Sequence, residues 1–306
     1  MFELTFLGTS ASAPSVRRGL SAQIVSYRDH RFLIDCGEGT QRQILQSGIG
    51  FRRLNRILIT HGHLDHILGL AGLLSTFMRW EAIDRLEIWG GRWALERIRD
   101  LLFGVVLRGH RPPIDIELIP IKKGLLFEDD GFRISAFPVT HRGRDSYGYR
   151  FDEPPRRPFL PERAEALGIP FGPLRRRLVE GETVTLPDGK VVTPDDVLGP
   201  VRPGTRLVHV GDCARIDNII QECHQADAIV IESTYLEDER ELAREFGHIT
   251  AHQAAELAVA AEAHQLFLTH ISRRYRDRQI LEEASAVFPN TTVARDFDRY
   301  EIRRSE

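Results

Sequence analysis

The chain has few cysteines, no long apolar run and almost no excess of charge of either sign. It has 3 cysteines in 306 residues, without the spacing of a disulfide or metal framework, so we expect reduced thiols in a cytosolic protein. No apolar run approaches the roughly 20 residues that span a membrane, and the first residues have the pattern of a strand rather than of an export signal. The formal net charge is -3, so any basic surface must be local. These absences predict a soluble, cytoplasmic protein without a membrane partner.

The chain does contain a dense cluster of metal-ligand residues, His61-Gly62-His63-Leu64-Asp65-His66. The cluster follows the apolar run 56–60, which predicts a buried strand, and precedes the apolar stretch 67–74, which predicts a helix. At a strand end, His61 and His63 are two residues apart and can point to the same side. Asp65 and His66 face them from the first helical turn. Imidazole and carboxylate groups suit zinc, manganese or iron(II), so the pattern predicts a metal site rather than a histidine-rich loop.

Three further candidate ligands end other apolar runs. His141 follows residues 137–140, Asp212 follows residues 207–211, and His270 follows residues 266–269. A single histidine after a strand is usually structural, but open α/β folds place their sites where several strand ends meet at one edge of a sheet. We therefore expect these side chains to join the first cluster.

The order of these ligands resembles the metallo-β-lactamase superfamily. The resemblance implies an α/β fold of the αββα type, a sandwich of two mixed sheets flanked by helices, with a two-metal site between its halves. By the same resemblance, one metal is held by His61, His63 and His141. The second metal is held by Asp65, His66 and His270, and Asp212 bridges the two.

Residues 152–204 differ in composition from the rest of the chain, which has the pattern of a single domain over residues 1–306. Ten of the 16 prolines lie between Pro154 and Pro203. The stretch 183–192 predicts a small hairpin that turns at Asp188-Gly189. From Pro154 to Arg177 there are six arginines and two glutamates, a local charge of +4. The segment is therefore either a solvated surface insertion or a projecting arm that binds a phosphate backbone through charge.

Three sets of residues resemble the ribonuclease Z family specifically. They are the arm with Gly172-Pro173-Leu174, the pair Ile231-Glu232-Ser233-Thr234-Tyr235 and His248-Ile249-Thr250, and the segment Thr269-His270-Ile271-Ser272-Arg273-Arg274-Tyr275. The pair resembles the family's His-Glu-Ala-Thr and His-Ser-Thr loops, from which Ile231, Ser233 and Ile249 depart. The resemblance implies an endoribonuclease that removes the 3′ trailer of precursor tRNA and leaves a 3′ hydroxyl. It also implies a tRNA-binding arm, a homodimer, and two Zn²⁺ per subunit, with Mn²⁺ or another divalent metal as the alternative.

Roles for individual residues follow from the resemblance and from the chemistry of phosphodiester hydrolysis. Asp65 is expected both to ligate metal and to accept the proton of the attacking water, and His248 to protonate the leaving 3′ oxygen. Glu232 either orients His248 from outside the metal ligands or caps its strand. The arginines expected to contact RNA are Arg17, Arg18, Arg156, Arg157, Arg175, Arg176, Arg177 and Arg274.

The first loop departs from the family pattern. Short ribonuclease Z enzymes often carry Pro-x-Lys-x-Arg-Asn, tied to rejection of tRNAs that bear a 3′ CCA, whereas this chain has Pro14-Ser15-Val16-Arg17-Arg18-Gly19. We therefore expect precursors that encode CCA to be cut. Two other functions stay open: a small-molecule phosphodiesterase or arylsulfatase of the same superfamily, which needs no basic arm, and a non-catalytic tRNA-binding protein, which needs no complete ligand set.

Elsewhere the sequence predicts alternating strands and helices. Helices are expected at 92–103, 216–223 and 251–263, the last capped by Thr250, and 236–246 has the pattern of an acidic, exposed connection. The apolar helix 68–77 is either a dimer contact or part of the core. Strands are expected at 1–8, 22–27, 31–35, 56–60, 87–90, 114–121, 132–139, 147–151, 206–210, 228–232, 265–269, 291–294 and 300–303.

Overall fold

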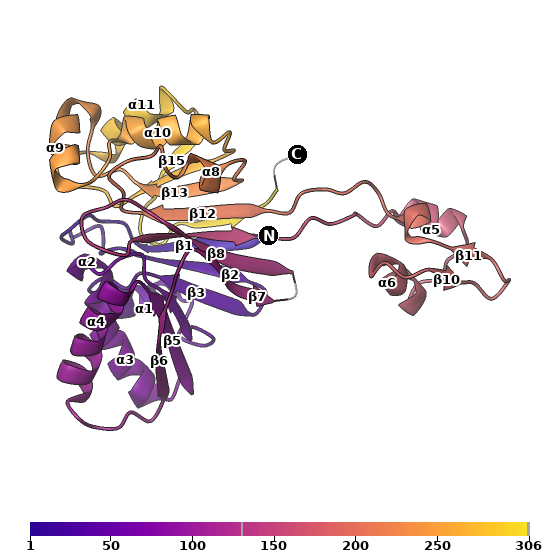
Figure 1. The fold of residues 1–306 in the computed structure, drawn as a ribbon, viewed down its shortest axis with the longest axis horizontal. Helices are drawn as coiled ribbons and strands as arrows, with labels where there is room; N and C mark the ends of the chain where they lie inside the picture. The colour runs from indigo at the N-terminus through magenta and orange to yellow at the C-terminus, as the bar shows by residue number, and fades with distance from the viewer. Residues whose placement is uncertain (130, 305–306) are drawn as a thin grey trace. The chain divides into compact units, whose positions relative to one another are not determined.

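The computed structural model describes residues 1–129 and 131–304. The chain divides into two compact units: Met1–Asp152 together with Thr205–Glu306, and Glu153–Gly204. In the first unit, two seven-stranded mixed sheets pack face to face and carry helices on their outer sides (Figure 1). The predicted αββα sandwich is therefore confirmed.

The first sheet places the histidine-rich motif at the end of a parallel strand. Its order is β16 (Arg299–Ile302), β1 (Phe2–Gly8), β2 (Ala22–Tyr27), β3 (His30–Ile34), β4 (Arg56–Leu58), β5 (Arg85–Gly90), β6 (Asp115–Pro120). Strands β3 to β6 are parallel, so their carboxyl ends lie at one edge. The outer side carries α1 (Thr40–Ser47), α2 (Leu64–Ile67), α3 (Gly69–Trp80) and α4 (Arg92–Arg99), and α4 continues as the π-helix Asp100–Leu107 (Figure 1).

The second sheet brings the other candidate ligands to the same site. Its order is β15 (Thr291–Val293), β14 (Leu266–Thr269), β13 (Ala228–Glu232), β12 (Arg206–Gly211), β9 (Tyr147–Asp152), β8 (Phe132–Pro138), β7 (Gly124–Asp129). Strands β12 to β15 are parallel, and Asp212 and His270 directly follow β12 and β14. The outer side carries α8 (Ile220–Cys223), α10 (Ala251–Ala260) and α11 (Asp277–Ser285), with α9 (Arg240–Phe246) at one end of this layer (Figure 1).

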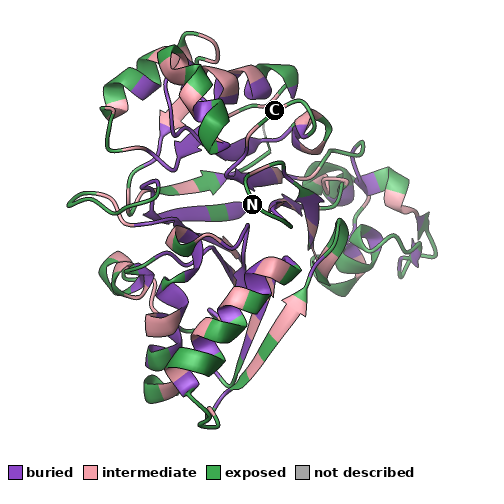
Figure 2. Cartoon of the chain, turned by 60° about the vertical axis from the view of Figure 1, so that its left-hand side comes forward, coloured by how far each residue is buried: buried purple, intermediate pink, exposed green. Residues whose placement is uncertain are grey.

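Three hydrophobic clusters hold this unit together. One fills the space between the sheets and contains Phe2, Phe32, Phe132 and Phe151, whose rings meet edge to face. The other two lie between each sheet and its own helices. The central strands are mostly buried, whereas the outer helices alternate buried and exposed residues (Figure 2). Each fully buried large apolar side chain contributes about 1.5–3 kcal/mol, so the two layers of strands form a rigid support for the loops at their ends.

The second unit has a small core of its own. It contains α5 (Pro161–Ala166), α6 (Pro173–Val179), β10 (Val184–Thr185), β11 (Val191–Val192) and α7 (Pro194–Val197). The predicted hairpin is present with shorter strands, and Gly189 takes the left-handed backbone (φ +85°) that its turn requires. The buried hydrophobic residues of this core are Ala164, Ile169, Leu178, Val184, Leu186, Val192, Val197 and Leu198.

Several predicted elements are wrong in extent or type. The helix expected at 92–103 ends at Arg99 and widens into a π-helix around Gly104, and the helix expected at 216–223 begins only at Ile220, after the turn-forming pair Asp217-Asn218. The stretch 236–246 contains helix α9, whose apolar signal is weak because Ala243 is its only buried residue. Strand β7 and helix α11 were not predicted. The cap at Thr250 is confirmed, since its side chain accepts the Gln253 N–H.

The apolar face of α3 belongs to the core. The hydrophobic cluster between the first sheet and its helices contains four buried residues of α3, namely Leu70, Leu73, Leu74 and Phe77. They therefore provide no contact face for a second subunit. None of the described helices is long and apolar enough to cross a membrane.

Candidate active site

The loop that carries His61 and His63 is fixed by close packing against α4. A Cβ atom on Gly62 would lie 2.9 Å from Ala94 Cα and 3.0 Å from the Trp93 ring, so no larger residue fits there without displacing the helix. Arg97 of the same helix donates to the Gly62 carbonyl at 2.8 Å. The loop therefore has little freedom, which favours a preorganised site.

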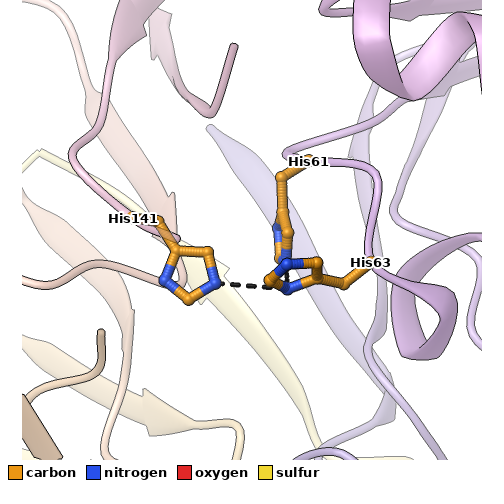
Figure 3. A group of neighbouring side chains, drawn as sticks. All are labelled: His61, His63 and His141. Atoms are coloured by element: carbon orange, nitrogen blue, oxygen red, sulfur yellow. Dashed lines mark hydrogen bonds between the residues drawn. The ribbon is translucent and has the colours of Figure 1, made fainter. Parts of the chain in front are cut away.

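His61, His63 and His141 come together as one group (Figure 3). His63 Nδ1 lies 2.9 Å from His61 Nε2 and 3.3 Å from His141 Nε2. His61 and His63 come from the loop after β4, whereas His141 follows β8 in the other sheet. The two halves of the sandwich thus contribute to a single three-nitrogen cluster.

Asp65, His66 and His270 form a second group. His270 Nε2 is 3.4 Å from Asp65 Oδ2, and His66 Nε2 is 3.6 Å from the same oxygen. Asp212 Oδ2 lies between the two groups, 3.4 Å from His66 and His270 Nε2 and 3.8–3.9 Å from His61 and His141 Nε2. All seven residues predicted as ligands are therefore brought together.

A further set of hydrogen bonds orients the imidazoles, and sequence reasoning missed most of it. His66 Nδ1 donates to Asp35 Oδ2 at 2.7 Å, and the same carboxylate accepts the Thr60 hydroxyl and N–H at 2.8 Å. His141 Nδ1 donates to the Gly247 carbonyl at 2.7 Å, and His270 Nδ1 lies 2.9 Å from Thr234 Oγ1. Such contacts fix which ring nitrogen faces a metal. Asp35 directly follows a buried strand, the same signal that identified Asp212.

Two of these residues adopt a backbone conformation that side chains disfavour. Asp35 and His270 have φ of 57° and 54°, in the left-handed region. Non-glycine residues in this region cost free energy and gather at functional sites. In this site the left-handed conformation occurs at Asp35 after the first sheet's β3 and at His270 after the second sheet's β14.

Burial keeps the first histidine group neutral. Burial, reinforced by the neighbouring imidazole of His66, holds the pKa of His61 well below its usual range, and burial next to His141 lowers the pKa of His63 to about 4. Burial alone would raise the pKa of Asp212, but His270, His66 and His61 outweigh it and hold that pKa well below its usual range. For His61, His63 and Asp212 these are the protonation states that bind metal. For His66, burial alone would lower the pKa, but the carboxylates of Asp212, Asp35 and Asp65 outweigh burial and raise the pKa well above its usual range, so His66 has to release a proton when a metal binds.

The donor set fits a divalent metal. Ligands about 2.0–2.2 Å from a tetrahedral metal lie roughly 3.3–3.6 Å from one another, and most distances between the proposed donor atoms are 3.3–3.9 Å. Among the described residues, His66 Nε2 is buried and has no hydrogen-bond partner, although its other ring nitrogen is bonded to Asp35. This buried imidazole nitrogen faces two carboxylates and makes no hydrogen bond. It is therefore free to bind a metal ion.

His248 borders this cluster without belonging to the seven. Its Nδ1 donates to the Glu232 carboxylate at 2.9–3.0 Å and lies 4.0 Å from Asp212 Oδ2. Burial alone would lower its pKa, but the Glu232 carboxylate outweighs burial and raises the pKa of His248 to about 9. Glu232 also accepts the Cys213 N–H and the Thr234 hydroxyl, so it connects His248 with the contact that orients His270.

Comparison with known proteins identifies the family. A ribonuclease Z of Bradyrhizobium diazoefficiens is 48% identical over 97% of this chain and 99% of its own length. A ribonuclease Z of Archaeoglobus fulgidus is 40% identical over 100% of this chain and 99% of its own length. The chain belongs to the ribonuclease Z family. The crystal structure of the short form of human tRNase Z has the same fold, with a TM-score of 0.68, 27% identity, and coverage of 98% of this chain and 99% of that one.

Family models agree with the αββα architecture of this ribonuclease Z family member. Residues 179–271 match the model described as a beta-lactamase superfamily domain. Residues 2–155 match the model described as anti-Pycsar protein Apyc1. The resemblance inferred from the strand-end ligands is therefore confirmed at the level of superfamily and family.

The arginines expected to contact RNA in a ribonuclease Z differ in whether other groups of the chain already bind them. Arg175 is buried, donates to the Ile169 carbonyl and lies 4.0 Å from the centre of the exposed Phe171 ring. Arg18 is bound to Asp277 and to the Ala294 carbonyl. The remaining ion pairs join Arg157 to Asp195, Arg176 to Glu180, Arg177 to Glu182 and Arg274 to Glu239. Arg17 and Arg156 are exposed. Binding of RNA through the paired arginines would therefore require exchange of intramolecular partners.

The contact between His66 and Asp35 yields a prediction for this ribonuclease Z site. Asp35→Asn leaves one oxygen acceptor for three donors, so His66 loses its fixed orientation. We expect metal affinity to fall about 10- to 100-fold, the usual effect of changing such an orienting partner. A chelator competition measures the affinity, and excess metal should restore much of the cleavage. Unchanged metal affinity, or a cleavage defect that added metal does not relieve, would show that Asp35 has only a structural role.

Proposed function

We propose that this chain removes the 3′ trailer from precursor tRNA by metal-dependent hydrolysis and leaves a 3′ hydroxyl on the tRNA. The observation that carries the proposal is the seven-residue cluster with the His248–Glu232 pair beside it, in a chain 48% identical to a ribonuclease Z over nearly its whole length. The direct test is incubation of the purified chain with a precursor tRNA and mapping of both product ends. A chain that binds precursor but releases no trailer would contradict the proposal.

The cofactor proposed is a pair of Zn²⁺ ions per subunit. His61, His63 and His141 would hold one ion, Asp65, His66 and His270 the other, and Asp212 both. When bound, such ions polarise the phosphate and lower the pKa of a water molecule. Zinc suits the nitrogen-rich first group, and the added carboxylate of the second group also suits Mn²⁺.

Two side chains of the protein, Asp65 and His248, would transfer the protons of the reaction. The Ser12 N–H donates to Asp65 Oδ2 at 3.0 Å, which orients this carboxylate to accept the proton of the attacking water. His248 is held by Glu232 through Nδ1, so Nε2 remains to protonate the leaving 3′ oxygen. Both groups would act at one scissile phosphate, Asp65 on the incoming side and His248 on the outgoing side.

The cavity in front of His248 suits the last nucleotide of the tRNA. Its volume is 550 Å³, and Tyr235, Phe246, Arg142 and Arg274 contribute to its lining. The Arg142 guanidinium lies 5.6 Å from the centre of the Phe246 ring. Aromatic rings and arginine planes are the surfaces on which unpaired RNA bases stack.

Residues 153–204 are proposed to bind the body of the tRNA. The acidic and basic residues of Glu153–Gly204 balance, eight of each, so the positive charge predicted for 154–177 is local to that part of the unit. Phe171, which is 85% exposed beside Arg175, offers an aromatic surface as well. We propose that the active form is a homodimer in the cytoplasm. In this dimer, residues 153–204 of one subunit would bind the tRNA that the other subunit cleaves.

Excision of the whole second unit should separate tRNA binding from hydrolysis. Asp152 of β9 lies directly opposite Arg206 of β12 in an antiparallel pair, so a short glycine-rich turn can replace residues 153–204. The core of that unit is separate from the three clusters of the first unit. We expect metal content and hydrolysis of a small phosphodiester to stay within about twofold. Affinity for precursor tRNA should fall at least tenfold, with a weaker dependence on salt as phosphate contacts are lost.

A mixing experiment tests the proposed dimer. Subunits lacking residues 153–204 and subunits carrying His61→Ala should each be inactive on precursor tRNA, and their mixture should recover cleavage through heterodimers. An inactive mixture in which subunit exchange is verified would show that the unit does not act across subunits. An excised variant that binds precursor tRNA normally would contradict the role of the unit itself.

A further inference from the structure

Helix α4 belongs to the layer outside the first sheet, but its first turn also contacts the loop that carries His141 from the second sheet. A Cβ atom on Gly143 of that loop would lie 3.4 Å from Trp93 Cζ3. A Cβ atom on Gly91, the residue before α4, would overlap with Asp145. The start of α4 therefore supports a loop whose residues after His141 are exposed.

The indole ring of Trp93 lies against the loops that carry His63 and His141. A Cβ atom on Gly62 would lie 3.0 Å from Cε3 and Cζ3 of the ring, and Cζ3 is also the atom nearest to the corresponding position on Gly143. Gly62 directly precedes His63, and Gly143 follows His141 by two residues. The rings of Trp93 and His63 meet edge to face, with their centres 6.1 Å apart. One rigid side chain thus contacts the backbone beside a ligand from each half of the site.

The position of the Trp93 ring is itself fixed. Arg97, one turn further along α4, places its guanidinium carbon 5.2 Å from the ring centre and donates to the Gly62 carbonyl at 2.8 Å. The helix is anchored in the core of the first sheet by three buried residues, Ala94, Leu95 and Ile98. An indole has only two side-chain torsions, so a ring held in this way is a stiff spacer.

Trp93 contacts the ligand loops rather than the space that the substrate would enter. Of the residues that the structure describes, those lining the cavity in front of His248 include His63 and Arg142 but not Trp93. Any effect of Trp93 on the reaction would therefore pass through the ligands.

We propose that Trp93 is a positioning residue that sets the distance between His63 and His141, and thereby the metal affinity of the first group, His61, His63 and His141. This role rests on the proposed pair of metals. In Figure 3, His141 approaches His61 and His63 from a separate segment of the chain. Because a metal needs all three nitrogens at once, a loop that carries one of them has to be held in register with the loop that carries the other two.

The contacts that orient the second group, Asp65, His66 and His270, do not involve α4. His66 Nδ1 donates to Asp35 Oδ2 at 2.7 Å, and His270 Nδ1 lies 2.9 Å from Thr234 Oγ1. Both partners remain when the indole is removed. Loss of the ring should therefore weaken the first group selectively, whereas a general loss of stability would weaken both groups.

The test is a zinc titration of the metal-free chain, in competition with a chelator. His63→Ala and His270→Ala each remove one proposed ligand, so they show which measured affinity belongs to which group. We expect Trp93→Ala to lower, by about 10- to 100-fold, the affinity that His63→Ala lowers, the usual effect of changing a residue that orients metal ligands. The affinity that His270→Ala lowers should not change.

Trp80→Ala is the matched control. Its ring is 57% exposed on α3 and meets Phe51 edge to face, so both zinc affinities should stay unchanged. Trp93→Phe keeps a smaller ring and should recover part of the lost affinity, and it provides the same comparison if the alanine variant does not fold. On precursor tRNA, excess zinc should restore kcat of Trp93→Ala, and KM should not change.

Three outcomes would contradict this role of Trp93. Equal loss of both zinc affinities would show that Trp93 only stabilises the fold, and no loss would show that it does not act on the metal ligands. A raised KM for precursor tRNA with unchanged zinc affinities would make Trp93 an RNA contact. A parent chain that binds a single zinc ion would contradict the proposed metal pair instead, and Trp93→Ala and His63→Ala would then both have to weaken that ion.

Discussion

Replacement of Asp212 by alanine should abolish cleavage of precursor tRNA and reduce the metal content of the purified protein. Its Oδ2 lies within 4.0 Å of a ring nitrogen of each of five histidines, and no other carboxylate of the site is so central. Without it, both proposed metals lose their shared ligand and the imidazoles lose their common counter-charge. We expect cleavage to fall by about 10⁴-fold or more, the scale of removing a group on which an entire reaction centre depends.

The same variant should remain folded. Asp212 lies among imidazoles in the loop after β12, outside the three hydrophobic clusters. Circular dichroism and the elution volume check the fold, and metal analysis checks the site. Asp217→Ala, which removes an exposed aspartate five residues further along the chain, is the matched control and should retain both metal and activity. An Asp212→Ala protein that retains its full metal content would refute the ligand assignment, and one that loses metal but cleaves normally would refute the role of the metal in cleavage.

The ligand cluster could be predicted from the sequence because its residues follow buried strands. Apolar runs end just before His61, His141, Asp212 and His270, and the carboxyl ends of parallel strands gather at one edge of a sheet. Asp35 carries the same signal but was missed, because it stands beside Cys36 and Gly37 in a turn rather than near another histidine. The orienting role of the Gly247 carbonyl has no side-chain signature, so no inspection of residue types would reveal it.

The behaviour of the arginines could not be predicted from charge counts. Between Pro154 and Arg177 the sequence gives a charge of +4, but Arg175 is buried against its own loop, and several neighbours pair with carboxylates close by. By contrast, a cavity whose lining includes Arg276 and Arg278 is assembled from the first loop, the segment after β14, α11 and the segment after β15. These segments lie far apart in the sequence, so only the tertiary structure shows the patch. Left-handed residues such as His270 are likewise set by the packed surroundings and not by local propensity.

Replacement of His248 by alanine should slow cleavage of precursor tRNA by about 10²- to 10⁴-fold, the contribution of a positioned general acid. Metal content should stay unchanged, because His248 Nδ1 is bonded to Glu232 at 2.9 Å and lies 4.0 Å from Asp212. The variant should still bind precursor tRNA. His252→Ala, on the next helix and paired with Glu256, is the control and should be nearly neutral.

The decisive measurement uses two kinds of leaving group. A ribose 3′ oxygen needs a proton as its bond to phosphorus breaks, whereas a nitrophenolate leaves without one. If His248 supplies that proton, His248→Ala should lose most of its rate on precursor tRNA and little on a nitrophenyl phosphodiester, and Glu232→Gln should show the same contrast in weaker form. Equal losses on both substrates would assign His248 a structural role. Loss of metal would instead make it a ligand, because with His141 and Asp212 it forms a third group within metal-binding distance.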